Sequence, residues 1–244
     1  MSARPRTLYA RLLSAYGPQG WWPLPSRAGK RGFDSRGYHQ GNYRWPRTAA
    51  ERFEIIMGAI LTQNTAWTNV EKALDRTRAE GLALPADLVA VPAGRLSSLI
   101  RSSGYFNQKA RKLREIALAF LGKSALSARG APSRERLLGL WGIGPETADS
   151  ILLYAFRKPV FVVDAYTRRF LTRVGLIEAG AGYDRVQELF HRGLPADHET
   201  YNEMHALIVE HAKRHCRAKP ACSGCPVSRS CRYFRTSHLN GRRF

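Results

Sequence analysis

The sequence has no cysteine before residue 216 and no apolar run near the roughly 18 residues that a membrane span requires. Its first residues lack the apolar segment of a secretory signal. Acidic residues are scarce, since 19 Asp and Glu face 39 Lys and Arg, for a formal net charge of +20. These absences argue against a membrane protein and a secreted disulfide scaffold. They predict a cytoplasmic protein with no membrane partner, whose basic surface binds an anion, most commonly nucleic acid.

Apolar residues recur at helical spacing throughout the chain, and no segment alternates as a strand does. Hydrophobic residues make up 44% of the chain, so a packed core is feasible. The first expected helix is LYARLLSAYG, which ends at Gly17. The sequence therefore predicts an all-α fold, and we expect a monomer because no segment resembles an oligomer interface.

The cysteines are confined to one basic stretch with the spacing C-x5-C-x2-C-x5-C. Structural zinc sites usually combine two C-x2-C or C-x2-H pairs, whereas this stretch has one such pair flanked by single cysteines. Thiolates spaced in this way suit a [4Fe–4S] cluster, in which each iron takes one cysteine. The pattern favours this cluster over zinc, with a role without metal favoured least, and the basic neighbours suggest a rigid phosphate-binding loop. The expected ligands are Cys216, Cys222, Cys225 and Cys231.

Residues 137–156, LLGLWGIGPETADSILLYAF, contain two helical segments interrupted at Gly142, Ile143 and Gly144. Glycines let a backbone approach a phosphate closely, and free N–H groups that open a helix attract an anion. Pro145 suits the first turn of the second helix, because an N–H there would be unpaired anyway. The same pattern forms plain helix–turn–helix corners, but the positive charge and the cysteines favour phosphate binding.

An apolar run over residues 159–163 ends at Asp164, twenty residues after Gly144, and a helix is expected to follow. Taken alone, Asp164 is an expected N-cap of that helix. A carboxylate at a helix N-terminus stays ionised, and this property also suits a site that stabilises positive charge.

Together, the hairpin, Asp164 and the cysteines resemble the endonuclease III branch of the helix-hairpin-helix (HhH-GPD) DNA glycosylases, over residues from about 50 to 232. The resemblance implies two helical domains with a DNA-binding cleft between them. The first cysteine gap is x5 where the best-known members have x6, a difference that a loop accommodates. The expected bounds are 44–158 for a continuous helical barrel, about 134–155 for its hairpin, 1–43 with 159–244 for a discontinuous domain, and 216–231 for its cluster loop.

The resemblance implies an enzyme that flips a damaged nucleotide out of double-stranded DNA and hydrolyses its N-glycosidic bond. Asp164 matches the family's catalytic Asp, which would stabilise the oxocarbenium charge that develops on the sugar. Bifunctional members carry a Lys where this chain has Glu146, and that Lys attacks the sugar and cuts the strand. Glu146 therefore implies a monofunctional enzyme, unless another Lys reaches the sugar.

Two further stretches match DNA-contacting motifs of the family. ILTQNTAW matches the gap-filling motif, in which Gln63 enters the vacated stack, and SSGYFNQKARKL matches the wedge loop, in which Tyr105 pries the strands apart. Taken alone, they would be a helix cap and a surface turn. The DNA-binding residues that the resemblance implies are Gln63, Asn64, Tyr105, Asn107, Lys109, Gly142, Ile143, Gly144 and Thr147.

One subgroup, the endonuclease III-like 3-methyladenine DNA glycosylases, is similar in further stretches: WWP, FEIIMGAILTQNT and the Glu after the hairpin. In that subgroup a Trp and a Phe sandwich the extruded base. An indole face attracts a cationic alkylated purine by about 0.5–2 kcal/mol, although paired tryptophans in unrelated proteins are usually core residues. The resemblance favours 3-methyladenine or 7-methylguanine as the substrate. The implied base pocket consists of Trp21, Trp22, Pro23, Phe53 and Glu146.

The Gly- and Arg-rich segment 27–47 leaves the identity of the excised base open. It is either a flexible basic linker that contacts DNA, or a loop over the pocket in which His39 and Tyr43 read a neutral base by hydrogen bonds. The second role would suit uracil, mismatched thymine or hypoxanthine. A bifunctional glycosylase and lyase like endonuclease III stays open, as does a non-catalytic Fe–S protein that binds DNA. Asp164 argues against the non-catalytic protein, and a DNA substrate would place the chain with the nucleoid.

Overall fold

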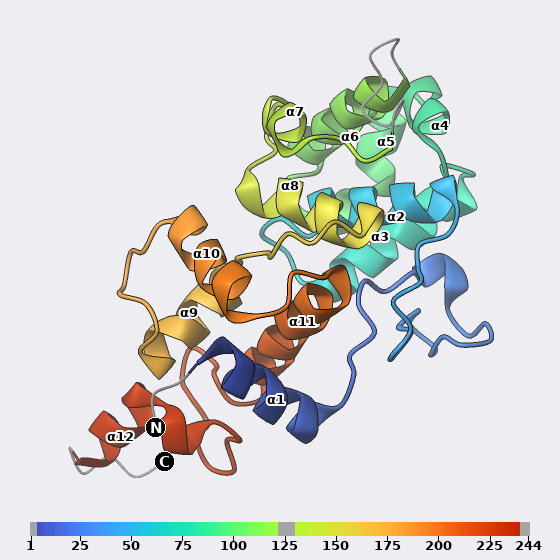
Figure 1. The fold of residues 1–244 in the computed structure, drawn as a ribbon. Helices are drawn as coiled ribbons and strands as arrows, with labels where there is room; N and C mark the ends of the chain where they lie inside the picture. Colours follow the sequence, from blue (N-terminus) through green and yellow to red (C-terminus); the bar gives the residue numbers. More distant parts are fainter. Residues whose placement is uncertain (1–3, 122–129, 240–244) are drawn as a thin grey trace. The chain divides into compact units, whose positions relative to one another are not determined.

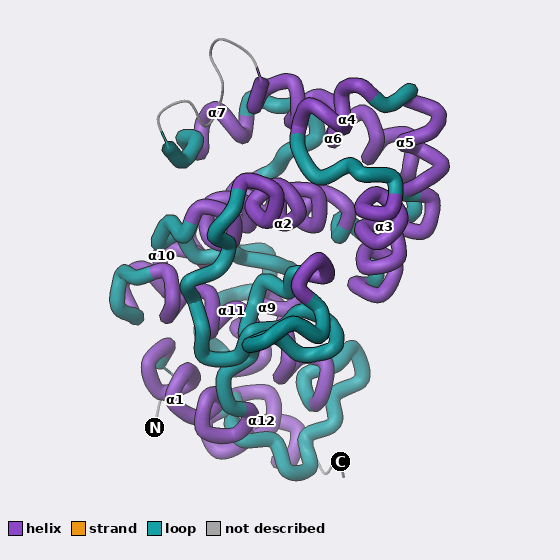
Figure 2. Tube along the Cα trace, turned by 90° about the vertical axis from the view of Figure 1, so that its right-hand side faces the viewer, coloured by secondary structure: helices purple, strands orange, loops and turns teal. Residues whose placement is uncertain are grey.

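A computed structural model of the chain describes residues 4–121 and 130–239, and within these ranges the chain forms helices and loops without strands (Figures 1 and 2). The predicted all-α fold is therefore confirmed. The chain divides into a discontinuous unit, Met1–Trp21 with Pro159–Phe244, and a continuous unit, Trp22–Lys158. None of the described helices is long and apolar enough to cross a membrane.

The continuous unit contains helix α2, Ala49–Leu61, which is buried along most of its length. A capping box starts this helix, because the Thr48 hydroxyl accepts from the Glu51 N–H and the Glu51 carboxylate accepts from the Thr48 N–H. The helix therefore has a fixed first residue from which its apolar side chains enter the core. The other helices of this unit are η1 (Pro25–Arg27), α3 (Trp67–Ala79), α4 (Pro85–Ala90), α5 (Ala93–Leu99), η2 (Arg101–Ser103), α6 (Phe106–Leu121), α7 (Arg134–Leu138), α8 (Pro145–Ser150) and η3 (Ile151–Ala155).

The predicted hairpin is formed by α7 and α8. Pro145 occupies the first turn of α8, as expected. Helix α8 continues directly into η3, a π-helical turn that is buried at every residue, so the second arm runs from Pro145 to Ala155. The burial of η3 against α2 anchors the hairpin to the core of the continuous unit.

The unit boundary differs from the one expected at residues 43 and 44, because residues 22–43 belong to the continuous unit. Leu24 is fully buried, and its N–H donates to the Gly37 carbonyl at 2.9 Å. Gly37 has a φ of 85°, and a Cβ there would lie 2.2 Å from the Leu24 oxygen. Trp22 packs closely against α2, where a Cβ on Gly58 would lie 3.0 Å from the indole nitrogen. These few apolar contacts fix a segment whose composition suggested a linker.

The segment 27–47 is packed, in contrast to the flexible linker considered above. Two guanidinium groups contact Trp45, with the Cζ atoms of Arg27 and Arg47 5.0 and 4.4 Å from its ring centroid. Arg27 also forms an ion pair of 2.5 Å with the nearly buried Glu51 of α2. The basic side chains of this segment therefore stabilise its own fold in part, and do not all face solvent.

His39 is only 2% exposed, and both ring nitrogens contact backbone oxygens. Nδ1 lies 2.7 Å from the Asn42 oxygen and Nε2 lies 3.1 Å from the Trp22 oxygen. Burial lowers the pKa of His39, since it disfavours the charged imidazolium. One role considered above for His39 was to read a base. In the structure, the buried ring instead contacts backbone oxygens, including that of Trp22.

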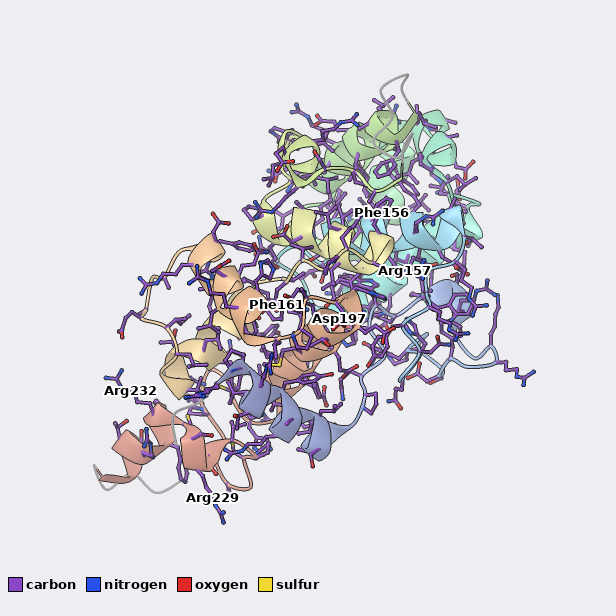
Figure 3. All side chains as sticks on the ribbon, in the orientation of Figure 1. Phe156, Arg157, Phe161, Asp197, Arg229 and Arg232 are labelled. Carbon is purple, nitrogen blue, oxygen red and sulfur yellow. The ribbon has the colours of Figure 1, made fainter. Side chains whose placement is uncertain are left out.

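The discontinuous unit is built on α11, His198–Arg214, which packs against α1 and α9. Residues 161–163, before α9, are buried, and the Phe161 ring (Figure 3) stacks on Phe190 with the centroids 3.7 Å apart. This stacking fixes where the chain enters α9. Helix α1 ends at Gly17, as predicted, and the Gly17 N–H donates to the Leu13 carbonyl. The remaining helices are α1 (Pro5–Tyr16), α9 (Ala165–Val174), α10 (Tyr183–Gly193), η4 (Ser228–Ser230) and α12 (Arg232–Leu239).

Candidate active site and DNA interface

Asp164 is the N-cap of α9, as the sequence predicted. Its Oδ1 accepts a hydrogen bond of 2.7 Å from the Thr167 N–H, which would otherwise lack a partner in the first turn. The side chain is 13% exposed, so the carboxylate is largely buried but still meets solvent. The helix thus fixes one carboxylate oxygen and leaves the other available.

The second oxygen faces a histidine that the sequence patterns did not single out. Asp164 Oδ2 lies 3.5 Å from Nε2 of His205, which projects from α11 and has a side chain 5% exposed. The contact joins α9 to α11, two helices that pack along one another. No local pattern distinguishes His205 from the other histidines of α11, so only the packing of the two helices reveals it.

The charge state of Asp164 results from opposing effects. Burial by itself would raise the pKa of this carboxyl group, because it removes water from the charged form. His205 and the Thr167 N–H stabilise the anion and outweigh burial, so the pKa of Asp164 lies below its ordinary value. The group is therefore an ionised carboxylate at neutral pH, which can stabilise positive charge developing beside it.

Trp21 lies in the same unit as Asp164 and contacts its histidine partner. The Trp21 and His205 rings meet edge to face, with centroids 5.6 Å apart and planes at 84°. The Asn202 side chain donates to the Trp21 carbonyl at 2.8 Å, and the Lys213 Nζ lies 6.0 Å from the Trp21 ring centroid. Among the expected pocket residues, Trp21 is therefore placed one side chain away from the carboxylate.

The remaining expected pocket residues belong to the continuous unit. Trp22 is 7% exposed and packs edge to face on Trp67 at 5.3 Å, while Phe53 is 2% exposed. Pro23 is buried, and Glu146 is exposed in the first turn of α8. Trp22 and Phe53 are thus largely buried within the continuous unit.

A cavity of about 440 Å³, which the sequence did not suggest, lies beside Phe53 in the continuous unit. Phe156 and Arg157, at the end of η3, line it (Figure 3), together with Arg52 and Lys158. Its described lining contains cations and aromatic rings but no Asp or Glu. Such a lining favours a neutral or anionic group over a cation.

Gln63, which follows α2, contacts the hairpin through its side chain. Its Nε2 donates to Thr147 Oγ1 at 2.9 Å and to the Gly142 carbonyl at 3.3 Å, while its Oε1 accepts from Lys112 Nζ at 2.6 Å. The gap-filling loop, the hairpin and helix α6 therefore meet at one side chain. Gln63 would have to leave these partners to enter a DNA stack.

The two hairpin glycines serve different purposes. Gly142 has a φ of 75°, and a Cβ there would lie 2.3 Å from the Lys112 side chain. A Cβ on Gly144 would meet nothing within 4 Å. Gly142 is thus favoured by its left-handed backbone, whereas Gly144 leaves open space at the start of α8, where a phosphate could approach. Ile143, between them, is 5% exposed, so only its backbone is available to DNA.

The expected wedge residue Tyr105 is 66% exposed and has a φ of 44°, which holds the ring clear of the preceding helix η2. Asn64, after α2, also has a positive φ of 53°, and Asn107 is exposed in the first turn of α6. A strained backbone at Tyr105 and Asn64 fits loops that present side chains to a partner.

Lys109 was expected to bind DNA, but its side chain is buried in the protein. The residue is 2% exposed, and its Nζ donates to the carbonyls of Leu61 and Ser103 at 2.8 and 2.7 Å. Burial, and to a smaller extent the nearby Lys112 charge, lower the pKa of Lys109 to about 8. The ammonium group ties the end of α2 to the loop before Tyr105. In sequence it stands in a basic run, and such a run is typical of surface residues.

Two exposed aromatic residues were also missed. Trp141, in the hairpin, is 43% exposed, with the Arg111 guanidinium 4.1 Å from its ring centroid. Tyr166, in the first turn of α9, is 37% exposed, with the Arg169 guanidinium 5.0 Å away. Arginine–aromatic pairs of this kind suit the phosphates and bases of DNA. The position of Trp141 directly before the hairpin glycines is a sequence signal that could have identified it.

The four cysteine side chains line one small cavity beside α9 and α11. Within the described residues, no three ligand-type side chains converge as a set for one metal ion. Burial raises the pKa of the Cys225 thiol to about 11, so a positive metal centre would be needed to hold this ligand as a thiolate. A cubane spreads its ligands over four irons, and they need not converge on one point. The four thiols around one cavity are a donor set that fits such a cluster.

The cysteine loop is attached to the helix that begins at Asp164. Arg169 Nε donates to the Cys216 carbonyl at 2.8 Å, and the Arg173 guanidinium donates to the Arg217 carbonyl at 2.5 Å. Arg229 and Arg232 project from the C-terminal part of this loop region (Figure 3). Helix α9 therefore carries the carboxylate at its first turn and the cysteine loop farther along.

Comparisons with known proteins agree with this architecture. The family model described as HhH-GPD superfamily base excision DNA repair protein matches residues 57–196. A Methanocaldococcus jannaschii protein assigned by name to the DNA repair glycosylases is 39% identical over 231 residues, which cover 92% of this chain and 94% of the relative. Endonuclease III of Thermotoga maritima is 30% identical, over 79% of this chain and 89% of its own.

Among solved structures, H. pylori 3-methyladenine DNA glycosylase (MagIII) bound to 1,N6-ethenoadenine has a TM-score of 0.67. It is 27% identical to this chain, and the match covers 87% of this chain and 98% of that one. The chain belongs to the HhH-GPD superfamily of base excision DNA repair proteins and is a DNA glycosylase of that family.

The position of Lys109 predicts a structural role that can be separated from DNA binding. Lys109→Met leaves two interior carbonyls without their donor, so we expect the free energy of unfolding to fall by about 2–4 kcal/mol. The salt dependence of duplex affinity should stay as in the wild type, because no phosphate contact is lost. Urea unfolding and DNA titrations at several salt concentrations measure both.

Lys72→Met, at an exposed site on α3, is the matched control and should change stability by less than about 0.5 kcal/mol. If Lys109→Met were as stable as the wild type and its duplex affinity depended less steeply on salt, Lys109 would instead be a phosphate contact.

Proposed function

We propose that this glycosylase is monofunctional: it hydrolyses the N-glycosidic bond of an alkylated purine and leaves an abasic site in double-stranded DNA. The observation that carries the proposal is the capped, ionised carboxylate of Asp164, combined with a Glu at position 146. A carboxylate supplies charge stabilisation, and the absent Lys removes the usual route to strand cleavage. The protein acts as a monomer, and its substrate places it with the nucleoid of the cytoplasm.

In the proposed reaction, the enzyme first flips the damaged nucleotide, which costs a few kcal/mol and is cheapest for bases that pair or stack poorly. As the bond to the base lengthens, positive charge develops on the sugar. Asp164 lies beside that charge and lowers its energy, while water adds to the anomeric carbon and loses a proton. The Oδ2 side of Asp164 is the part that can orient this water, because Oδ1 is held by Thr167.

The positions of the lysines support a reaction without a Schiff base. The unit that contains Asp164 has Lys213 and Lys219 as its lysines. Lys213 lies over the Trp21 ring, and Lys219 stands in the cysteine loop. In the second unit, Lys109 and Lys112 donate to protein oxygens. The Lys109 and Lys112 amines would have to leave these oxygens to attack a sugar.

An alkylated purine is favoured by the similarity to MagIII and by the chemistry of the leaving group. A purine alkylated at N3 or N7 carries positive charge and departs without strong general-acid help, so one carboxylate is a sufficient catalyst. Trp21 supplies an aromatic ring near the carboxylate's partner His205, and an indole face attracts such a cation.

A second candidate is a glycosylase for a neutral base such as uracil, mismatched thymine, hypoxanthine or ethenoadenine. The cavity beside Phe53 favours it, because Arg52, Arg157 and Lys158 would repel a cationic purine. The same cationic side chains would donate hydrogen bonds to the carbonyl oxygens of bases such as uracil, thymine and hypoxanthine.

For the DNA contacts, we propose that the backbone at Gly142–Gly144 binds a phosphate, and that Gln63 and Tyr105 act in the duplex. Gly144 leaves room for a phosphate, and Tyr105 is exposed. Asn64, Asn107 and Thr147 complete this interface. Trp141 and Arg111 extend it with an exposed ring and a cation.

We propose that the cysteines bind a [4Fe–4S] cluster, with zinc as the alternative. The cluster supplies a rigid, charged centre for the loop, and its expected part in base excision is structural. Because Arg169 and Arg173 of α9 bind carbonyls of this loop, a cluster that orders the loop would also order α9.

A single-lesion oligonucleotide panel tests the reaction. We expect the wild type to release 3-methyladenine or 7-methylguanine from methylated duplex, with strand breaks only after alkali. Glu146→Lys introduces an amine at the family's lyase position, and this variant should form a covalent adduct with DNA that borohydride traps. Glu146→Gln, the matched control, should release base and form no adduct.

Strand cleavage by the wild type without alkali would contradict a monofunctional enzyme. Release of uracil or hypoxanthine without activity on methylated DNA would favour the second candidate.

The metal is tested on anaerobically purified protein. We expect a brown protein with about four irons and four sulfides per chain. Cys222→Ala should lose iron and colour, and should loosen α9, which hydrogen exchange at the Thr167 and Arg168 amides measures. Ser228→Ala, in the same loop, is the control and should keep both. A colourless wild type with one zinc per chain would overturn the cluster.

A further inference from the structure

We propose that His205 is a positioning residue for base excision: its Nε2–H holds the second oxygen of Asp164 and so fixes the plane of the carboxylate beside the sugar. The proposal rests on the function proposed for Asp164 and extends it to a residue on another helix. It starts from the separation of 3.5 Å between His205 Nε2 and Asp164 Oδ2.

The carboxylate needs a second partner because the helix supplies only one. Thr167 binds Oδ1 at 2.7 Å, and this single bond would leave the group free to rotate about its Cα–Cβ and Cβ–Cγ bonds. A donor at Oδ2 defines the plane of the carboxylate as well as its position. Hydrogen bonds in free enzymes are often long and tighten around the transition state, so 3.5 Å is a starting distance for such a contact.

The His205 ring is itself held by aromatic edges. Trp21 meets it at 5.6 Å and 84°, and Phe161 meets it at 6.2 Å and 88°. Phe161 in turn stacks on Phe190, which belongs to α10. Because Phe161 is fully buried and His205 itself is only 4% exposed, the imidazole has little freedom to turn its Nε2 away from Asp164.

A histidine suits this place because its planar ring carries an N–H donor that packing can hold in one orientation. A donor at Oδ2 stabilises the anionic form of the carboxylate, which is the form that a positively charged sugar requires. Burial alone would favour the protonated, inactive form of Asp164.

The remaining titratable groups near the pair have partners of their own. His191 of α10 accepts the Phe161 N–H at 3.2 Å and stacks on Tyr201. The Glu203 carboxylate of α11 accepts the Gln19 N–H at 2.8 Å. Lys213, farther along α11, lies over Trp21. We therefore assign the acid limb of the pH dependence of base release to Asp164, and His205 is the partner that influences the pKa of this carboxyl group.

The experiment compares two variants of the whole protein. His205→Phe keeps a ring of similar size and removes the donor, whereas His205→Gln keeps an amide donor. His198→Phe, on the same helix and partly exposed, is the control. Single-turnover release is measured on the lesion that the wild type excises best, across pH 4–9, and affinity is measured with a duplex containing an uncleavable analogue. The pKa of Asp164 is measured separately by carbon NMR of the carboxyl group.

We expect His205→Phe to reduce the release rate at least tenfold, with duplex affinity within about twofold of the wild type. Its acid limb and the NMR pKa of Asp164 should both rise by on the order of one unit, because burial then dominates. His205→Gln should recover most of the rate and of the pKa, and His198→Phe should match the wild type.

An unchanged Asp164 pKa in folded His205→Phe would overturn the proposal, as would equal losses in both His205 variants. If the wild type releases no base from any lesion, the proposed function fails, and the NMR titration still decides whether His205 sets the ionisation of Asp164.

Discussion

The hydrogen bond between the Asp164 carboxylate and the Thr167 N–H is the constraint on which the rest of this site depends. It fixes a negative charge at the first turn of α9, where the helix field favours an anion. Burial works against that charge, and the contact with His205 helps to restore it. The hydrogen bond that caps helix α9 thus also positions the proposed catalytic carboxylate. Helix stability and catalysis therefore depend on the same bond.

Helix α9 connects this carboxylate with the cysteine loop. Arg169 and Arg173 bind carbonyls of the loop, and Cys231 Sγ lies 3.3 Å from the Arg173 carbonyl. A cluster that orders the loop would therefore also order the helix that positions Asp164. In the continuous unit, Gln63 has a comparable linking role, because it joins the gap-filling loop to the hairpin.

Features that depend on local sequence were predictable, and features that depend on packing between distant residues were not. The Asp164 cap follows from an apolar run and a polar residue before a helix. His205 lies 41 residues farther along, on another helix, and no spacing pattern reveals it. Lys109 was misplaced because a buried lysine and a surface lysine look alike in a basic run. Residues 22–43 group with the continuous unit, because a few apolar contacts outweigh a Gly- and Arg-rich composition.

The central claim is that an ionised side chain at position 164 lowers the energy of a cationic sugar. Its most direct test is the rate of base release by Asp164→Asn, measured under single-turnover conditions beside the affinity for the same duplex. Asparagine keeps the cap and removes the charge, so the account predicts a loss of at least about a hundredfold in rate with affinity preserved. A folded Asp164→Asn protein that releases base at the wild-type rate would contradict it.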